Sequence, residues 1–244
     1  MSENTQDQNT RYYDLESVVY DENRYGSVSG RRVEEFHKKV LDILLTTELN
    51  ASASVLEMGC GTGRLLHHLA SNPFDLYGID MSPGMLAVAR ERLDGAEKEI
   101  SLQESNATET PFEAATFDAI YSILVVNLIP EYEKMFQEAA RLIKPGGVFV
   151  FNIPNLESIY FLGGLYVNFR GKTVGSNEAG HRYSHWFTSS EWRGALTNSG
   201  FTIDKVLGQP PHLRVMDNSA PLNANGPGRL LSKSIYIRAR RNGE

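Results

Sequence analysis

Three glycines and two acids have the spacing in this chain that is best suited to ligand chemistry. The glycines are Gly59, Gly61 and Gly63, and the acids are Glu57 and Asp80. Glycine accepts positive φ angles and lets backbone N–H groups approach a ligand closely. A carboxylate at Asp80 can accept hydrogen bonds from both hydroxyls of a ribose. These residues together predict a binding site for a nucleotide-like small molecule.

The residues around the glycines predict a strand, a turn and a helix. Val55 and Leu56 form a short apolar run before Glu57, and leucines recur behind the turn at helical spacing, beginning with Leu65. Such a turn lies at the carboxyl end of a strand, where open α/β sheets bind ligands. An acid at this strand end suits a ligand with an ammonium group better than a pyrophosphate, which it would repel.

Residues 57–63, Glu-Met-Gly-Cys-Gly-Thr-Gly, resemble the first motif of the class I methyltransferases that use S-adenosylmethionine, (E/D)-x-G-x-G-x-G. Residues 79–85 resemble the second motif of that family, residues 117–120 its Phe-Asp-x-(V/I) motif, and residues 143–148 its (L/I)-K-P-G-G step. The resemblance is strong over residues 30–152 and weak over residues 186–240. An NAD-dependent oxidoreductase is the less favoured alternative, because its G-x-G-x-x-G/A fingerprint needs a small residue where this chain has Arg64.

The alternation of strand and helix patterns, together with the resemblance, predicts an α/β fold. We expect a Rossmann-like three-layer sandwich whose seven-stranded sheet is mostly parallel and has an antiparallel last strand. Residues 201–207 and 234–238 alternate as the last two strands and form an antiparallel hairpin. Ser82 and Pro83 predict a helix start, and residues 188–191 form a capping-box pattern.

The resemblance implies S-adenosyl-L-methionine as the cofactor and assigns residues to it. Met81 would lie beside the adenine, where a polarizable thioether suits an aromatic face. Relatives often have Asp at the place of Asn106, whose side-chain carbonyl can still accept a hydrogen bond from the adenine amino group. The expected cofactor residues are Glu57, Gly59, Gly61, Gly63, Asp80, Met81, Asn106, Ala107, Leu124 and Tyr20.

Two segments are candidates for covering the site. Residues 1–28 begin with a polar stretch, 1–10, that we expect to be disordered, followed by a tyrosine-rich stretch. The tyrosines are interpreted equally well as a lid over the cofactor or as a helix packed on the core. We expect a methyltransferase domain over residues 29–244, with an insertion at 155–187 that is rich in glycine and aromatics. We interpret this long connection as a substrate cap, and a second small core is the alternative.

The cap contains the candidates for a general base, which are His181, His185 and Glu178. An oxygen or ammonium nucleophile must lose a proton before or during attack, whereas a carbon acceptor needs no base. His181 and His185 are four residues apart, as in a helical metal pair, but the sequence offers no third ligand, and we expect no metal.

Composition excludes several classes of function. The net charge of −6 disfavours a nucleic-acid partner, which needs clustered Lys and Arg. Cys60 is the only cysteine, so no disulfide framework exists, and no apolar stretch approaches the roughly 18 residues of a membrane span. The polar start of the chain lacks an apolar signal core. Composition therefore predicts a cytoplasmic protein, and the resemblance implies an enzyme that methylates an O, N or C atom of a small molecule. A cofactor-binding regulator without turnover is the non-enzyme alternative, and the acceptor and oligomeric state stay undetermined.

Overall fold

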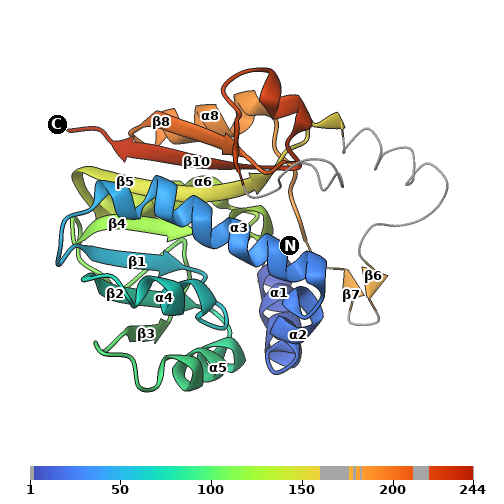
Figure 1. Ribbon diagram of the computed structural model, residues 1–244, viewed down its shortest axis with the longest axis vertical. Coiled ribbons are helices and arrows are strands. Elements are labelled where there is room, and N and C mark those ends of the chain that lie inside the picture. The colour runs from blue at the N-terminus through green and yellow to red at the C-terminus, as the bar shows by residue number, and fades with distance from the viewer. Residues whose placement is uncertain (1–2, 160–175, 178–179, 182, 211–219, 244) are drawn as a thin grey trace.

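The computed structural model describes residues 3–159, 176–177, 180–181, 183–210 and 220–243. Its centre is a twisted sheet in the order β3-β2-β1-β4-β5-β10-β8-β9 (Figure 1). The strands are β1 (Ser54–Met58), β2 (Asp75–Asp80), β3 (Ser101–Glu104), β4 (Phe117–Ser122), β5 (Ile143–Pro154), β8 (Phe201–Gly208), β9 (Leu222–Asn223) and β10 (Ser234–Arg241). A separate two-stranded ribbon pairs β6 (Ser176–Asn177) with β7 (Gly180–His181).

The strand directions confirm the predicted sheet. β1 pairs in parallel with β2 and β4, and parallel pairing continues to β3 on one side and β5 on the other. β10 runs antiparallel to both β5 and β8. The described sheet has eight strands instead of the expected seven, because the two-residue β9 pairs with the end of β8. The predicted hairpin partners, β8 and β10, pair as expected.

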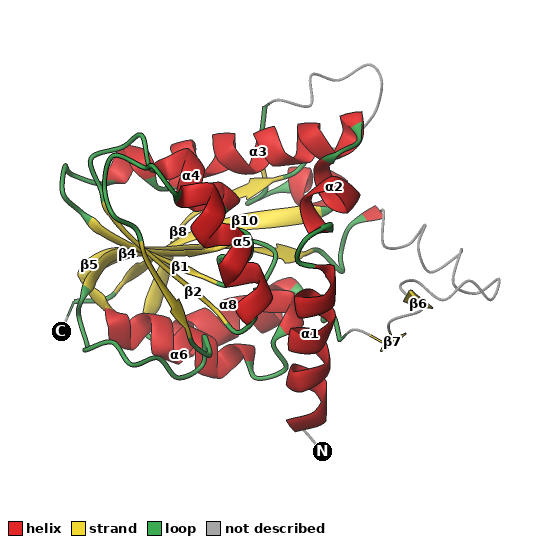
Figure 2. Ribbon diagram, turned by 90° about the horizontal axis from the view of Figure 1, so that it is seen from below, coloured by secondary structure: helices red, strands yellow, loops and turns green. Residues whose placement is uncertain are grey.

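Helices cover both faces of the sheet (Figure 2). One face carries α3 (Val28–Leu44), α4 (Arg64–Leu69) and α5 (Pro83–Leu93), and the other carries α6 (Tyr132–Leu142) and α8 (Ser189–Asn198). Short 3₁₀ turns lie at Thr46–Glu48, Val126–Leu128 and Pro227–Leu231. This arrangement is the expected three-layer sandwich. Among the helices of the described residues, none combines the length and the apolar composition that crossing a bilayer requires.

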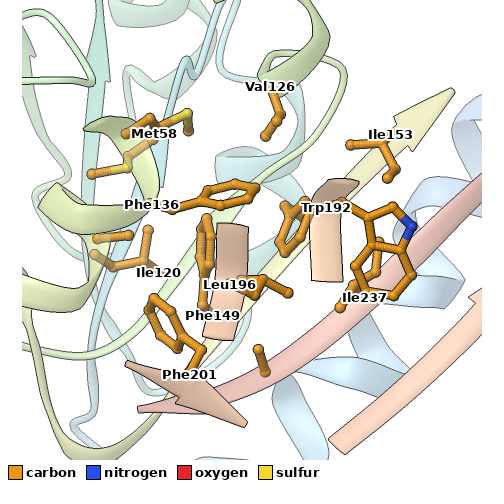
Figure 3. Close-up of a cluster of buried hydrophobic side chains, with 14 of the residues drawn as sticks. Met58, Ile120, Val126, Phe136, Phe149, Ile153, Trp192, Leu196, Phe201 and Ile237 are labelled. Atoms are coloured by element: carbon orange, nitrogen blue, oxygen red, sulfur yellow. The ribbon is translucent and has the colours of Figure 1, made fainter. Parts of the chain in front are cut away.

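Alternation along the strands divides the core into two clusters. Val55 of β1 packs toward α3 and α4, whereas its neighbour Leu56 packs toward α6. On the α6 and α8 side, Trp192, Phe136 and Phe149 are fully buried and interdigitate (Figure 3). Full burial of such a side chain contributes about 1.5–3 kcal/mol. These layers fix the carboxyl ends of the parallel strands at one edge of the molecule.

The predicted helix starts are both present. The Ser82 hydroxyl accepts a hydrogen bond from the Met85 N–H at 3.1 Å, with Pro83 at the first helical position. Thr188 and Glu191 form a reciprocal capping box at α8. The cap at Ser82 matters for function, because it sets where α5 begins beside the end of β2.

The N-terminal segment differs from the expectation of disorder over residues 1–10. It forms α1 (Glu3–Glu16) and α2 (Tyr20–Tyr25), which lie beyond the carboxyl ends of β1 and β2 (Figure 1). Tertiary contacts account for the difference, because the Asn9 side chain donates to the Leu128 carbonyl at 3.0 Å. A polar sequence gives no sign of such contacts when its partner lies more than a hundred residues away.

Candidate functional site

A cavity of about 160 Å³ opens at the carboxyl ends of β1, β2 and β4. Its walls include every residue expected to bind the cofactor except Gly63, namely Glu57, Gly59, Gly61, Asp80, Met81, Asn106, Ala107, Leu124 and Tyr20. Gly63 has a different place. It is the N-cap of α4, has a φ of 73°, and lies so near α5 that a Cβ would come within 3.0 Å of Ala89 Cβ.

The other two glycines of the loop differ in what surrounds them. Gly59 and Gly61 both have positive φ angles, 76° and 51°. A Cβ on Gly59 would come within 2.5 Å of Val125 Cγ2, whereas a Cβ on Gly61 would meet no protein atom within 4 Å. Gly59 therefore allows close packing within the protein. Gly61 borders open space at the cavity, where a ligand can approach its backbone.

Asp80 joins the end of β2 to the glycine loop. Its Oδ2 accepts a hydrogen bond from the Gly61 N–H at 2.8 Å, and its Oδ1 accepts one from the Ser82 N–H at 2.9 Å. Burial raises the pKa of this carboxyl. A carboxylate has about four acceptor positions, so the two oxygens retain capacity for ribose hydroxyls. The carboxylate also has a structural role, which the sequence did not reveal.

Glu57 brings a buried acid to the same cavity. It is 2% exposed, and its Oε2 accepts a hydrogen bond from the Tyr121 hydroxyl at 2.9 Å. Burial is the main reason that its pKa lies well above the ordinary value. A cationic ligand group would offset this penalty, because an opposite charge nearby favours the ionised carboxylate. The acid therefore fits the ammonium group of S-adenosylmethionine.

Asn106 forms hydrogen bonds within its own turn. Its side-chain oxygen accepts hydrogen bonds from the backbone N–H and the hydroxyl of Thr108, at 2.9 and 3.0 Å. These bonds use both lone pairs of the carbonyl within the turn. The residue lines the cavity beside Ala107, and acceptance of a hydrogen bond from an adenine amino group stays a prediction.

Two aspartates of the tyrosine-rich segment anchor it beside the cavity through hydrogen bonds. Asp21 accepts hydrogen bonds from the Thr62 hydroxyl, at 2.9 Å, and from the Arg92 guanidinium. Asp14 accepts from the Ser82 hydroxyl and from the Gly84 N–H, the latter at 3.0 Å. The tyrosines that line the cavity from α1 and α2 are Tyr13, Tyr20 and Tyr25. The segment therefore packs on the domain and contributes to the cavity wall, and its action as a lid stays a prediction.

A second cavity, of about 820 Å³, adjoins the first. The two share the wall residues Tyr13, Tyr20, Tyr25, His37, Leu124 and Leu128. The second is lined further by polar and basic groups, which include Arg24, Asn127, Asn152, Gln209 and Lys233. The loop that follows β8 contributes through Gln209.

The structure describes the three expected general bases to different extents. Glu178 lies outside the described residues, and of His181 only the backbone, in β7, is described. The His185 Nε2 lies 2.7 Å from Glu191 Oε1, and its ring contacts Phe187. His185 lines neither of the two cavities. Within the described residues there is no cluster of three or more metal-ligating side chains.

The structure instead brings His37 to the wall between the two cavities. The sequence pattern did not single out this residue. Its neighbour Phe36 and the later Val40 and Leu41 belong to the apolar face of α3. A histidine on such a face is typical of the core, and only the packing of α3 against α2 and β10 reveals the cavities beside it.

The comparisons with known proteins agree with this site. Residues 56–151 match a family described as a methyltransferase domain. The sterol 4-C-methyltransferase of Caenorhabditis elegans is 28% identical over 151 residues, 58% of this chain and 45% of that protein. The demethylmenaquinone methyltransferase of Shouchella clausii is 32% identical over 130 residues, 49% of this chain and 55% of that protein. The chain spans about half the length of these curated relatives.

The fold has a close match among solved structures. A Thermotoga maritima protein described as a SAM-dependent methyltransferase, possible histamine N-methyltransferase, has a TM-score of 0.68 and 19% identity, covering 98% of this chain and 100% of that one. The matched domain, the sheet order and the glycine loop support a class I S-adenosylmethionine-dependent methyltransferase.

The contacts of Asp80 predict the result of a conservative substitution. We expect Asp80→Asn to weaken binding of S-adenosylhomocysteine by about 10-fold to 100-fold, since hydrogen bonds to a charged group contribute about 1.5–3 kcal/mol. Isothermal titration calorimetry measures the change. Asp80→Ala is the less informative variant, because it removes both acceptors of the Gly61 and Ser82 N–H groups, whereas Asn keeps one of the two. Unchanged affinity in folded Asp80→Asn would exclude a ribose-binding role for the charge.

Proposed function

We propose that this protein transfers the methyl group of S-adenosylmethionine to a small-molecule acceptor. The observation that carries the proposal is the junction of two cavities. The first has the glycine loop, Glu57 and Asp80, and the second shares with it the wall that contains Tyr20 and Leu124. A regulator without turnover needs only the first cavity, so the second favours a bisubstrate enzyme.

The residues of the first cavity have separate roles in holding the cofactor. Asp80 accepts the ribose hydroxyls, Glu57 pairs with the ammonium group, and Met81 lies against the adenine. Gly61 lets the ligand approach the backbone. When bound, S-adenosylmethionine supplies a methyl group on a sulfonium centre, and aromatic rings such as that of Tyr20 attract such a cation.

The protein promotes methyl transfer mainly through alignment and exclusion of water. Well-oriented reactants reach effective molarities of about 10⁵–10⁸ M. We propose that residues 1–28 act as the lid that excludes water, and that residues 155–187 belong to the cap over the acceptor. The carboxyl edge of the sheet supports this placement, because β5 ends beside the second cavity at Pro154.

The acceptor occupies the second cavity in this proposal. Relatives are named for methylating a sterol and demethylmenaquinone, both small organic molecules. The negative net charge supports a small-molecule acceptor over a nucleic acid. A cytoplasmic location stays a prediction from the composition.

Calorimetry tests the cofactor assignment. We expect S-adenosylmethionine and S-adenosylhomocysteine to bind and NAD not to bind, because Arg64 occupies the place of the third small residue that a dinucleotide site needs. Tight binding of NAD, without a response to S-adenosylhomocysteine, would refute the proposed function.

A further inference from the structure

His37 is a buried imidazole that borders both cavities. It lies on α3, is 2% exposed, and belongs to the shared wall. Its ring contacts the Tyr236 ring, with centroids 5.9 Å apart. Among the described residues, no hydrogen bond joins another group to a His37 ring nitrogen, and neither nitrogen belongs to the fully buried polar atoms that lack a partner. The ring nitrogens therefore reach the cavity space that His37 lines, where a ligand can form a hydrogen bond with them.

The charges around His37 keep it uncharged. Burial is the largest cause that lowers its pKa, to about 3, and the nearby Arg64 and Arg24 guanidinium groups lower it further. The Tyr236 ring of β10 contacts it. The titratable and charged groups that line its two cavities are Tyr12, Tyr13, Glu16, Tyr20, Arg24, Tyr25, Glu57, Cys60, Arg64, Asp80 and Lys233. A neutral imidazole has one nitrogen that accepts a hydrogen bond and one that donates. His37 therefore presents an acceptor at the junction of the cavities.

We propose that His37 contacts the methyl acceptor and receives the proton of its reacting atom, and that this atom is a hydroxyl oxygen. The inference rests on the proposed function and adds the catalytic residue and the class of acceptor. Atoms and charge balance in the step. The oxygen lone pair forms the bond to the methyl carbon, the carbon–sulfur bond breaks with its electrons going to sulfur, and the hydroxyl proton moves to the free nitrogen of His37.

The choice of a hydroxyl over an amine follows from acidity and charge. A hydroxyl oxygen that gains a methyl group becomes positively charged and strongly acidic, so even a weak base takes its proton. An alkylammonium group has a pKa of about 10 and would not release its proton to this imidazole. Two basic residues, Arg24 and Lys233, and one acid, Glu16, line the second cavity, so its net positive charge disfavours an ammonium group there.

The other buried groups at the site are less suited to this role. Glu57 accepts a hydrogen bond from the Tyr121 hydroxyl, and we assign it to the ammonium group of the cofactor. Tyr20 borders both cavities, but burial raises its pKa, which makes it a donor and not a base. The geometry thus leaves His37 as the neutral acceptor at the junction.

Nuclear magnetic resonance of protein with ¹⁵N-labelled imidazole rings tests the contact without turnover. His37→Gln assigns the His37 signals, and the protein is saturated with S-adenosylhomocysteine. We expect millimolar phenol to shift both His37 nitrogen signals, while anisole, which lacks the hydroxyl proton, leaves them unchanged. No shift with phenol, or equal shifts with both probes, would overturn the proposal. Failure of S-adenosylhomocysteine to bind would instead overturn the proposed function.

Turnover supplies a second readout with radiolabelled methyl donor and three probes, phenol, catechol and benzylamine. On a methylated hydroxyl probe, we expect His37→Gln to lower kcat by about 10²–10⁴-fold and to keep the Kd of S-adenosylhomocysteine within about twofold, at unchanged thermal stability. His67→Gln is the matched control, since His67 is exposed on α4 and lines neither cavity. Normal kcat in His37→Gln, or methylation of benzylamine alone, would contradict the proposal. If no probe is methylated, the nuclear magnetic resonance comparison of phenol with anisole is the test of the proposal.

Discussion

Gly61→Ala is expected to weaken binding of S-adenosylhomocysteine by at least about 100-fold, or about 2.7 kcal/mol. The added methyl group would meet no protein atom within 4 Å, so the protein itself accommodates it. It would enter the open space beside the loop, where we place the cofactor, and would prevent close approach to the backbone. The backbone strain at a φ of 51° costs only about 1–2 kcal/mol of stability.

Gly95→Ala provides the matched control for this substitution. Gly95 also has a positive φ, 83°, and a methyl group added to it would likewise meet open space, yet it lines neither of the two cavities. Both variants therefore lose a similar amount of thermal stability, and calorimetry separates them. Wild-type affinity in Gly61→Ala would show that the cofactor does not pass over this glycine. Gly59→Ala is a poor test, because its methyl group would clash with Val125 and disturb the fold.

The parallel half of the fold was predictable because its signals are local. β1, β2 and β4 each contain an apolar run, and Ser82 and Pro83 indicate the start of α5 directly. β5 runs from Ile143 to Pro154. Its full length is not evident from the sequence, because Lys144, Pro145 and the two glycines within it are typical of a break. β9 was missed because two residues carry no periodic pattern.

In the candidate site, too, the residues with local sequence signals were predictable and the others were not. Glu57, the glycines and Asp80 are contiguous with their strands, so their positions follow from the sequence. The contacts of Asp14 and Asp21 join segments that are far apart in the chain, and sequence alone gives no sign of them. The position of His37 at the cavities likewise depends on how α3 packs against its neighbours. Because His37 lies on an apolar helix face, the sequence pattern indicates only a core residue.

The lid gives the last prediction. We expect Asp21→Asn to raise the dissociation rate of S-adenosylhomocysteine by about 10-fold to 100-fold, since each hydrogen bond to a charged group contributes about 1.5–3 kcal/mol. Asp21 holds α2 to the glycine loop through Thr62 and to α5 through Arg92. A cofactor beneath this segment leaves only when those bonds break. Stopped-flow displacement measures the rate, and hydrogen exchange measures opening of α1 and α2.

Glu22→Gln is the control for Asp21→Asn, because it removes the same charge from the neighbouring residue. Glu22 is exposed, and its side chain forms no ion pair with another described residue. The control should match wild type in both the dissociation rate and the exchange of α1 and α2. Faster exchange in Asp21→Asn with an unchanged dissociation rate would mean that the segment opens without releasing the cofactor. Residues 1–28 would then stabilise the domain but would not gate its site.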